Sequence, residues 1–532
     1  MPKEEFVEED TVVGRELEDL EKYGSKGCGF LGKVVMSSGE KPVLGRKILF
    51  DLAKPHLVLI CGKRGGGKCL DGETLITLED GSLATIKDLE HDSRKVLSLS
   101  HDYKIKAAEK AEFFKRPVER MLEMTFRSGK KIKLTPEHPL LTIDGWRPAE
   151  ELKQGSRIAT PRIQPFFGNE FLRECEIKLL AYLLAEGHIK RRVVWFSNTD
   201  EKMIQDFKNA VKDFNPALTV RTSEKNNHRV INPSLENTIL HAVRKKGKLQ
   251  KGTIIAPKNF LREWLKEIGV YGLLSAEKFI PQKVLRLPKP KLALFLNRLF
   301  SCDGSIYFES GRYRLSYSSV SEQLIRQVQH LLLRFGILSK LRYKTTRFES
   351  KEFKSFEIEI EGMQVKSFLQ EIGFFGSKEE RQKNALLFLE SKISNPNVDT
   401  IPIEVWNHYK PKSWTEIGKG MNYAIPKSLR ESQFYAPSRQ KLLQIARLDN
   451  NKLAEQLASS DIFWDEIKQV KELNGNFEVF DISVPENHNF IANDIVVHNS
   501  YTLAIMLEEF AKMMPALKAR IAVIAIDTVG IF

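Results

Sequence analysis

Two kinds of hydrophobic pattern share the chain. Short apolar runs, and stretches in which apolar and polar residues alternate, predict β-strands, and they lie at 57–61, 74–78, 121–126, 479–484 and 520–527. Apolar residues spaced three and four positions apart predict helices, and they lie at 179–186, 296–303 and 500–514. The chain has 532 residues, which is too long for one ordinary domain, so we expect about three or four domains.

The strand predicted at 57–61 leads into a GxxxxGK sequence. In a P-loop, glycine amides cradle the phosphates of ATP and the lysine reaches the β and γ oxygens. The residues in these positions are Gly62, Gly65, Gly66, Gly67 and Lys68. The next residue should be a serine or threonine that ligates Mg²⁺, but it is Cys69, and a turn-and-strand pattern follows where a P-loop needs a helix.

The missing half of this loop begins at Ser500. The helix and the strand predicted after it, the second ending in Asp527, complete the order strand, loop, helix, strand when Lys68 is joined to Ser500. The Ser500 hydroxyl would then ligate Mg²⁺ in the restored GKRGGGKS. We therefore predict that the two ends of the chain are parts of a split α/β P-loop NTPase and that residues 69–499 are an insert. The role of Asp527 stays open.

Charge and composition narrow the class of partner. The net charge is +14, and the residues outside 69–499 are nearly neutral, so the insert carries almost all of the positive excess, which favours a nucleic acid. Five scattered cysteines are too few for a disulfide framework or a zinc site. No apolar run is long enough to span a bilayer, and the amino terminus lacks the apolar core of a secretory signal. We expect a cytoplasmic protein without a membrane partner.

The residues at the two borders of the insert suit its removal from the chain. The Cys69 thiol can attack the carbonyl of Lys68 and turn an amide into a thioester, whose acyl group the Ser500 hydroxyl can then accept. Asn499 can cyclise onto its own carbonyl and cut the bond to Ser500, with His498 as proton donor. The remaining ester would rearrange to a Lys68–Ser500 amide. This chemistry needs no cofactor.

Motifs beside both borders support this interpretation. They are Cys69–Thr77, Thr135-Pro-Glu-His138, Phe480–Val484, Glu486–Phe490 and Val497–Asn499. In these residues the insert resembles an intein, and the resemblance implies an all-β Hint fold. It also implies that Thr135 and His138 polarise the amino-terminal scissile bond, that Asp481 assists acyl transfer, and that His488 assists asparagine cyclisation. For His138 taken alone, an ordinary loop histidine is the alternative.

The centre of the insert contains an internal duplication. Each copy has an apolar helix that ends in an acid and a glycine, at Glu186-Gly187 and Asp303-Gly304, followed by a strand, a Ser/Thr-rich turn and an amphipathic helix, at 193–212 and 314–333. The copies resemble LAGLIDADG homing endonucleases, an α/β fold of two αββαββα halves. The resemblance implies that Glu186 and Asp303 bind Mg²⁺ and cleave double-stranded DNA at the homing site in the intein-less gene.

Three further features bear on DNA. Lys278 precedes Phe279-Ile280-Pro281 and matches the lysine before the endonuclease family's IP motif, which implies a catalytic aid, and a solvated surface lysine is the alternative. Basic stretches that could contact phosphate lie at 190–192, 244–246 and 283–291. Residues 376–455 match neither motif set, and their basic and aromatic composition predicts an accessory subdomain that contacts DNA.

The predicted organisation follows the chain. The host ATPase occupies 1–68 and 500–532, the two ends of the chain. The Hint domain occupies 69–165, its amino-terminal segment, and 456–499, its carboxy-terminal segment. Between these segments lie the endonuclease at 170–375 and the accessory subdomain at 376–455. The stretch 27–68, joined to Ser500-Tyr-Thr-Leu, resembles HerA/FtsK-like hexameric ATPases. That resemblance implies a homo-oligomeric, DNA-moving host that binds ATP and Mg²⁺ after splicing.

Two other functions stay open at this point. One is an ATP-binding protein with a permanent regulatory insertion, and the other is a DNA endonuclease whose splicing borders are inactive. Intact-mass measurement separates them from self-splicing, because only splicing releases a fragment that runs from Cys69 to Asn499.

Overall fold

The chain forms two compact units, one made of Met1–Gly67 with Ser500–Phe532 and the other of Lys68–Asn499. The computed structural model describes residues 11–37, 43–51, 68–189, 194–223, 226–233, 259–348, 351–391 and 399–499. The four P-loop glycines, Ser500, Asp527 and the basic stretches 190–192 and 244–246 lie outside the described residues. Among the helices in these ranges, none is long and apolar enough to cross a membrane.

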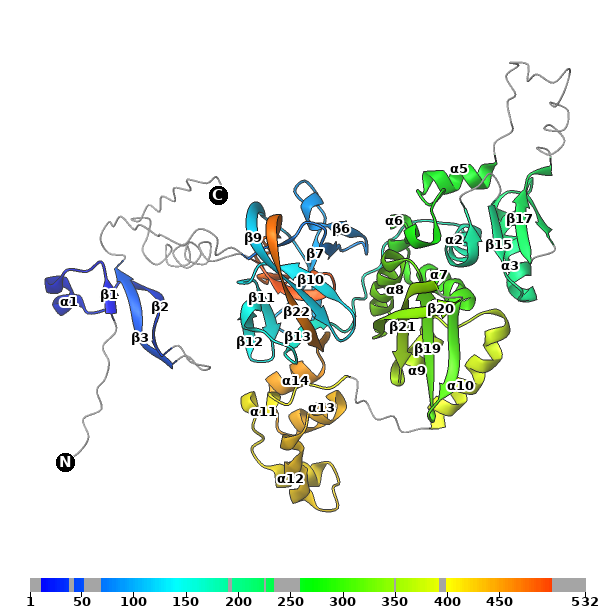
Figure 1. Cartoon of the computed structure of the whole chain (residues 1–532). Coiled ribbons are helices and arrows are strands. Elements are labelled where there is room, and N and C mark those ends of the chain that lie inside the picture. The colour runs from blue at the N-terminus through cyan, green and yellow to red at the C-terminus, as the bar shows by residue number, and fades with distance from the viewer. Residues whose placement is uncertain are drawn as a thin grey trace. The chain divides into compact units, whose positions relative to one another are not determined.

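The first unit contains a three-stranded sheet (Figure 1). In spatial order its strands are β1 (Thr11–Val13), β3 (Val43–Asp51) and β2 (Cys28–Ser37), with β1 parallel and β2 antiparallel to β3. The helix α1 (Leu17–Tyr23) lies between β1 and β2 in the chain. Arg15 and Asp51, both almost fully buried, form an ion pair of 2.6 Å, which ties the loop before α1 to the end of β3.

The second unit begins and ends in β-sheet. A five-stranded sheet has the order β13-β22-β4-β10-β9, and a six-stranded sheet has the order β12-β11-β24-β23-β5-β6. The strands of the first are β4 (Leu70–Asp71), β9 (Phe113–Phe126), β10 (Lys131–Leu134), β13 (Arg157–Pro161) and β22 (Ile462–Ile482). Those of the second are β5 (Leu75–Thr77), β6 (Leu83–Thr85), β11 (Pro139–Thr142), β12 (Gly145–Pro148), β23 (Asn489–Ala492) and β24 (Ile495–His498). Both sheets combine strands from the two ends of the unit.

One hydrophobic core lies between strands of the two sheets. Leu134 of β10, Phe480 of β22 and Phe490 of β23 are among its buried residues. The alternating patterns that predict strands at 74–78, 121–126 and 479–484 correspond to β5, the end of β9 and the end of β22, so these predictions are confirmed. The hairpin of β7 (Val96–Leu99) and β8 (Ile105–Ala108) and the short turns η1 (Ile86–Asp88) and η2 (Ala149–Glu151) complete this part.

The centre of the second unit consists of two halves that share the order helix, strand, strand, helix, strand, strand. The first has α2 (Glu174–Glu186), β14 (Gly187–His188), β15 (Val194–Ser197), α3 (Glu201–Phe214), β16 (Thr219–Thr222) and β17 (Asn227–Ile231). The second has α7 (Lys289–Asp303), β18 (Gly304–Glu309), β19 (Arg312–Ser319), α8 (Glu322–Arg334), β20 (Lys340–Phe348), β21 (Lys351–Glu361) and α9 (Met363–Glu371). The strand orders also correspond, β14-β15-β17-β16 and β18-β19-β21-β20. The duplication read from the sequence is therefore a duplication of structure.

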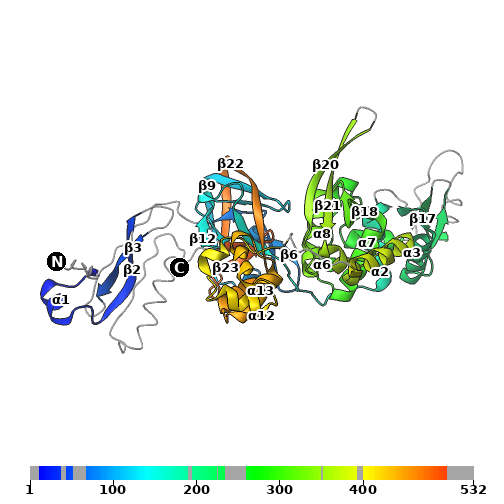
Figure 2. The same ribbon diagram turned by 90° about the horizontal axis from the view of Figure 1, so that it is seen from below.

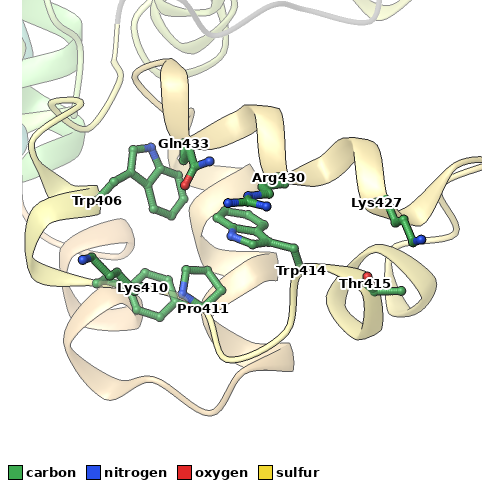
Figure 3. Close-up of a pocket in the computed structure, with 9 residues that line it drawn as sticks. Trp406, Lys410, Pro411, Trp414, Thr415, Lys427, Arg430 and Gln433 are labelled. Atoms are coloured by element: carbon green, nitrogen blue, oxygen red, sulfur yellow. The ribbon is translucent and has the colours of Figure 1, made fainter.

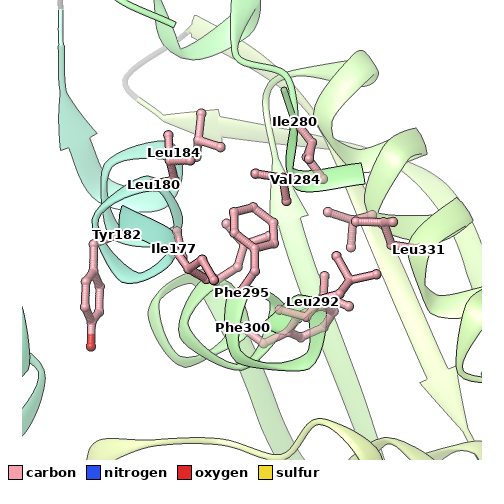
Figure 4. Close-up of a cluster of buried hydrophobic side chains, with 14 of the residues drawn as sticks. Ile177, Leu180, Tyr182, Leu184, Ile280, Val284, Leu292, Phe295, Phe300 and Leu331 are labelled. Atoms are coloured by element: carbon pink, nitrogen blue, oxygen red, sulfur yellow. The ribbon is translucent and has the colours of Figure 1, made fainter. Parts of the chain in front are cut away.

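Helices α2 and α7 pack against each other through their apolar faces (Figure 4). Leu180 of α2 and Phe295 of α7 are fully buried in a core that both halves share. Full burial of such a side chain contributes roughly 1.5–3 kcal/mol, so this pairing fixes the relative position of the two helix ends. The connecting elements are α5 (Phe260–Glu267), η3 (Ser275–Glu277) and α6 (Gln282–Leu285). Figure 2 shows β20 and β21 as a long hairpin at one edge of the second half.

The segment 376–455, which the sequence sets apart as one subdomain, divides between two cores. The turn η4 (Gly376–Lys378) and helix α10 (Glu379–Ser391) belong with the duplicated halves, because Ala385 is buried in their core. The elements α11 (Val405–His408), α12 (Trp414–Gly420), η5 (Pro426–Phe434), α13 (Arg439–Leu448) and α14 (Lys452–Ala458) pack instead on the β-sheets. There Val405 and Leu442 share a core with Val496 of β24. The name helical subdomain is used below for residues 399–458.

Candidate functional site

The strand register places Cys69 between two residues predicted to act with it. The short strand β4 lies between β10 and β22, and its Leu70 is opposite Leu134 on one side and Phe480 on the other. In an antiparallel pair the next position along one strand faces the previous position of its partner. Cys69 therefore lies beside Thr135 and Asp481, although both are distant in the sequence.

Thr135 holds the backbone of Cys69 from both directions. The Cys69 N–H donates to Thr135 Oγ1 at 3.1 Å, and the Thr135 N–H donates to the Cys69 carbonyl at 3.0 Å. The N–H of His138 donates to the Thr135 carbonyl at 3.0 Å and closes a turn between β10 and β11. This turn explains the spacing of the TxxH motif, because it brings the imidazole of His138 close to Cys69, whose backbone Thr135 holds.

His138 is a neutral imidazole at physiological pH. Its side chain is completely buried, and burial lowers its pKa to about 3. His498 and Lys68 contribute to this lowering of the pKa, whereas the backbone of Cys69 favours the protonated ring. A neutral imidazole can accept a proton at one nitrogen while it carries one at the other. It is therefore suited to move a proton between a thiol and an amide nitrogen.

The Cys69 thiol is held in its protonated form. Its exposed fraction is 3%, and burial raises its pKa to about 11, with the charge of Asp481 acting in the same direction. Arg116 on β9 opposes both effects, because its Nε donates to Sγ at 3.4 Å. Arg116 escaped the sequence analysis. The strand pattern of β9 does not reveal it, because the contact depends on the pairing of Arg116 with Val479 of β22.

The second sheet brings the carboxy-terminal border of the insert close to His138. Strand β24 ends at His498, and Val497 pairs with Leu140 of β11, the strand that follows His138. The Nδ1 atom of His498 lies 2.6 Å from the carbonyl oxygen of Asn499, and burial lowers the pKa of His498 to about 4. The rings of Trp146 and His498 are perpendicular, with centroids 4.7 Å apart.

Asn499 is completely buried and fixed by the segment 484–488. The side-chain amide of Asn499 satisfies both neighbouring backbone groups in one orientation. In that orientation, Oδ1 accepts from the Val484 N–H at 2.7 Å and Nδ2 donates to the His488 carbonyl at 2.5 Å. The Asn499 N–H donates to the same carbonyl at 3.1 Å. His488 has a φ of 54°, a left-handed backbone that turns this carbonyl toward Asn499. The turn explains how a motif before β23 acts on the residue after β24.

The predicted splicing residues therefore meet at one site. Those that the structure places there are Lys68, Cys69, Thr135, His138, Asp481, His488, His498 and Asn499. Asp481 is completely buried, and its Oδ1 accepts from the N–H of Ile482 at 2.9 Å. Ser500 lies outside the described residues, so its position relative to Cys69 is not part of this geometry.

A second cluster of charged groups lies where α2 and α7 end. Glu186 and Asp303 are the last residues of these paired helices. Lys278 is 4% exposed, so a solvated surface lysine is the wrong interpretation of it. Its Nζ donates to three carbonyls at the end of α2, those of Leu183 at 3.0 Å, Ala185 at 3.2 Å and Gly187 at 3.0 Å.

Lys378 repeats this arrangement on the other helix. Its Nζ donates to carbonyls at the end of α7, those of Ser301 at 2.5 Å, Cys302 at 3.0 Å and Gly304 at 2.6 Å. Each helix end, which carries partial negative charge, thus has an ammonium group on its carbonyls, from buried Lys278 at one end and half-buried Lys378 at the other. The sequence analysis missed Lys378, which has no IP motif after it. The internal duplication was the only signal that a second lysine like Lys278 should exist. It does not predict which residue this is, because Lys378 is far from α7 in the sequence.

The two carboxylates are near enough for the charge of Glu186 to act on Asp303. Burial and the charge of Glu186 raise the pKa of Asp303 to about 7, while Lys278 and Lys378 act in the opposite direction. Burial also raises the pKa of Glu186, against a 2.5 Å hydrogen bond from Asn198 Nδ2. Oxygen donors that repel one another fit Mg²⁺. Within the described ranges, no group of three or more His, Cys, Asp or Glu side chains could hold a metal ion, so such an ion would take its other ligands from phosphate and water.

The glycine after each acid is required by close packing. Gly187 and Gly304 directly follow the last residues of the two helices and have φ values of −87° and −84°, so neither is in the left-handed conformation. A Cβ atom on Gly187 would lie 2.5 Å from the carbonyl oxygen of Leu183, and one on Gly304 would lie 2.5 Å from that of Phe300. Only glycine lets the chain turn directly from each helix into its strand.

Comparisons with known proteins match most of the insert. The family model of the intein splicing domain matches residues 76–499. The chain is 30% identical to the replicative DNA helicase DnaB of Rhodothermus marinus over 454 residues, 81% of this chain and 46% of the helicase. It is 23% identical to the replication factor C small subunit of Thermococcus kodakarensis over 615 residues, 86% of this chain and 66% of that protein.

A solved structure gives a shorter match. A crystal structure of a DnaB intein from Synechocystis sp. PCC 6803 is 30% identical and covers 18% of this chain and 70% of its own, with a TM-score of 0.18. The chain spans about half the length of the DnaB helicases that it matches. Since the matched family covers most of the chain and both borders of the insert meet at one buried site, the chain belongs to the intein splicing domain family.

Proposed function

We propose that residues 69–499 excise themselves from this chain and join Lys68 to Ser500. The observation that carries the proposal is the position of His138. Its ring lies at the Cys69 backbone, and β11, which begins directly after His138, pairs with β24, the strand that ends at the other border. One buried site thus contains the groups for cutting at both borders. A permanent insertion needs no such convergence of a thiol, an asparagine and two neutral histidines.

The first step exchanges an amide for a thioester. The Cys69 sulfur attacks the carbonyl carbon of Lys68, the bond to the Cys69 nitrogen breaks, and the thiol proton ends on the released amine. The Thr135 hydroxyl orients the Cys69 N–H at 3.1 Å, and neutral His138 carries the proton from sulfur to nitrogen. Arg116 assists by stabilising negative charge on the sulfur.

The later steps release the insert. The Ser500 hydroxyl attacks the thioester, the Cys69 sulfur leaves with a proton, and a branched ester remains. The Nδ2 atom of Asn499 then attacks its own carbonyl carbon, and the bond to Ser500 breaks as the Ser500 nitrogen gains a proton. His498 polarises this carbonyl through the 2.6 Å contact of Nδ1. The free Ser500 amine finally attacks the ester and forms the amide to Lys68.

Intact-mass measurement of the expressed protein tests the proposal. Wild type should yield a fragment from Cys69 to Asn499 and a joined product of the two ends. Cys69→Ala should stop cleavage before residue 69, and Asn499→Ala should stop cleavage after residue 499. Cys175→Ala, which removes another buried free thiol, is the control and should splice normally. A wild-type chain that stays uncut over a range of temperature and reductant would refute self-splicing and favour the permanent insertion.

Splicing would restore a P-loop in the host. The GKRGGGKS sequence, the order of predicted elements and the DnaB helicase and replication factor C relatives support an ATPase host. The resemblance of 27–68 supports a homo-oligomeric HerA/FtsK-like one. The joined product should hydrolyse ATP with Mg²⁺. The unspliced Cys69→Ala precursor should not, because its loop lacks the Ser500 hydroxyl, and turnover by that precursor would contradict this part.

A second proposed function, DNA cleavage of the LAGLIDADG type, rests on the pseudo-symmetric ends of α2 and α7. Glu186 and Asp303 would hold Mg²⁺, which would activate water and neutralise the leaving oxygen. Glu186→Gln or Asp303→Asn should abolish nicking of double-stranded DNA that contains the intein-less coding sequence, while splicing continues. Asp213→Asn, an exposed carboxylate on α3, should leave nicking unchanged. Equal nicking by all three variants would exclude this site.

A further inference from the structure

The helical subdomain contains a pocket that the splicing chemistry does not use (Figure 3). The pocket has a volume of about 500 Å³, enough for a nucleobase with its sugar, and opens to solvent. Its lining is of two kinds, aromatic side chains and cations, and the residues used below are Trp406, Tyr409, Trp414, Lys410, Lys427 and Arg430. No carboxylate is among the residues that line it.

The aromatic walls are fixed from behind. The Nε1 atom of Trp406 donates to the Tyr435 carbonyl at 3.0 Å, and the Tyr409 hydroxyl donates to Asp449 Oδ2 at 3.0 Å. The rings of Trp406 and Trp414 lie with centroids 5.5 Å apart. Trp406 and Tyr409 are buried in the subdomain core, whereas Trp414 is only half-buried. The accessible aromatic surface of the pocket is therefore mainly that of Trp414, which packs against the buried ring of Trp406. Fixed side chains of this kind cost little further ordering when a ligand binds.

The cations lie along the opening. Lys410, Lys427 and Arg430 are exposed, and none of the three forms an ion pair with any residue that the structure describes. Figure 3 shows Lys410 and Lys427 at opposite ends of the pocket, with Arg430 beside Trp414. Separated positive charges on both sides of an aromatic surface match successive phosphates of a chain better than one isolated phosphate.

The aromatic surface continues outside the pocket. Phe434 is the last residue of η5 and Tyr435 follows it, and the two are 65% and 69% exposed. Large exposed aromatic side chains next to free cations are typical of surfaces on which the bases of a single strand stack. Phe434 and Tyr435 therefore offer further rings for base stacking outside the pocket.

We propose that this pocket binds one unstacked nucleotide of a DNA strand. The base stacks on Trp414 against the wall made by Trp406, and the flanking phosphates contact Lys410, Arg430 and Lys427. The proposal goes beyond splicing and holds whether or not Glu186 and Asp303 cut DNA. It gives the helical subdomain a role of its own in holding a strand that has left the duplex stack.

Fluorescence anisotropy with two matched probes tests the proposal. The protein is the full chain with Cys69→Ala and Asn499→Ala, and the probes are a labelled thymidine oligonucleotide of about ten nucleotides and an abasic oligomer with the same number of phosphates. The parent chain should bind the thymidine probe more tightly. Trp414→Ala should weaken that binding by about tenfold and remove the preference, while Arg430→Glu should weaken both probes and lower the salt dependence.

Matched variants keep the result interpretable. Lys452→Glu reverses an exposed charge of α14 outside the pocket and should cost less than Arg430→Glu. If Trp414→Ala unfolds the subdomain, Trp414→Phe should retain the base preference and Trp414→Leu should lose it. Equal binding of the two probes by the parent chain, equal losses in Lys452→Glu and Arg430→Glu, or tighter binding of polyglutamate than of the oligonucleotide would overturn the proposal.

Discussion

His330 and Asp494 join the duplicated halves to the splicing strands, with Nδ1 of His330 2.8 Å from Oδ1 of Asp494. His330 belongs to α8, and Asp494 lies in the turn between β23 and β24 with a φ of 59°. Gln164 Nε2 donates to the same oxygen at 2.7 Å. Strand β24 runs from this turn to His498, so helix α8 holds one end of the hairpin whose other end carries the carboxy-terminal border.

Asp494→Ala should destabilise the second unit and slow cleavage after Asn499. Burial alone would raise the pKa of Asp494, but His330, Lys130 and Gln164 together lower it to about 2. Removing this carboxylate takes the acceptor away from His330 and Gln164 and leaves Asp465 to compensate the charge of buried Lys130. We therefore expect a loss of about 2–4 kcal/mol in the free energy of unfolding. The control is Asp144→Ala, which breaks an exposed 2.7 Å pair with His408 and should cost under about 1 kcal/mol.

The effect of Asp494 should depend on pH in one direction. A carboxylate whose folded pKa is depressed stabilises the protein above its unfolded pKa, roughly 3.9, and loses that contribution as the pH falls toward the folded value of about 2. The difference in urea midpoint between wild type and Asp494→Ala should therefore narrow as the pH falls from about 4 toward 2. A difference that widens over that range would contradict this assignment.

Arg116→Met should slow the first splicing step. The Nε atom of Arg116 donates to Cys69 Sγ at 3.4 Å and opposes the burial that raises the thiol's pKa to about 11. Without it the thiolate becomes scarcer, and we expect a loss of about three- to tenfold at neutral pH. The measurement is thiol-induced cleavage before residue 69 in an Asn499→Ala background. The rate should rise with pH toward about 11 in both proteins, with Arg116→Met slower throughout.

A variant of the same strand provides the control. Arg120→Met removes an exposed guanidinium of β9 that pairs with Glu472 at 2.9 Å. Because Arg120 does not contact the thiol, its loss should leave the cleavage rate and its pH profile unchanged. Equal slowing by both substitutions would mean that the charge of the strand matters and the contact to sulfur does not.

The sequence predicted most residues of the splicing site because they belong to motifs beside the two borders of the insert. Cys69 and Asn499 were identified from their types at the borders of the insert, and His138 from the resemblance of its motif to inteins. The structure brings the three together. Arg116, Lys378 and the pair of His330 with Asp494 were not identified. Each acts through a contact between segments that are far apart in the chain, and no local pattern encodes the strand register or helix docking that creates such a contact.

The boundary inside 376–455 could not be read for a similar reason. The sequence shows helices on both sides of residues 392–398, and an amphipathic helix reveals that it packs but not on what. Helix α10 completes the duplicated halves through Ala385, while α11 packs on the β-sheets through Val405. The choice between two neighbouring cores is a property of the tertiary structure.

Gly129→Ala should separate the duplicated halves from the splicing strands. Gly129 lies in the turn after β9 with a φ of +88°, and a Cβ atom there would lie 2.5 Å from the carbonyl oxygen of Leu341 on β20. Leu341 N–H also donates to the Ser128 carbonyl at 2.8 Å, and Arg326 donates to the Gly129 carbonyl at 3.1 Å. A methyl group therefore strains this turn and pushes β20 away. We expect a loss of about 3 kcal/mol and two calorimetric transitions in place of one.

Gly145→Ala isolates the steric part of this prediction. Gly145 has a comparable φ of +103°, yet a Cβ atom there would have no neighbour within 4 Å. It should therefore cost only the backbone strain of a left-handed alanine, about 1 kcal/mol, and leave a single transition. If both alanine variants lose the same stability and keep one transition, then backbone strain explains Gly129 and the docking of β20 on the β9–β10 turn contributes nothing to the cohesion of the unit.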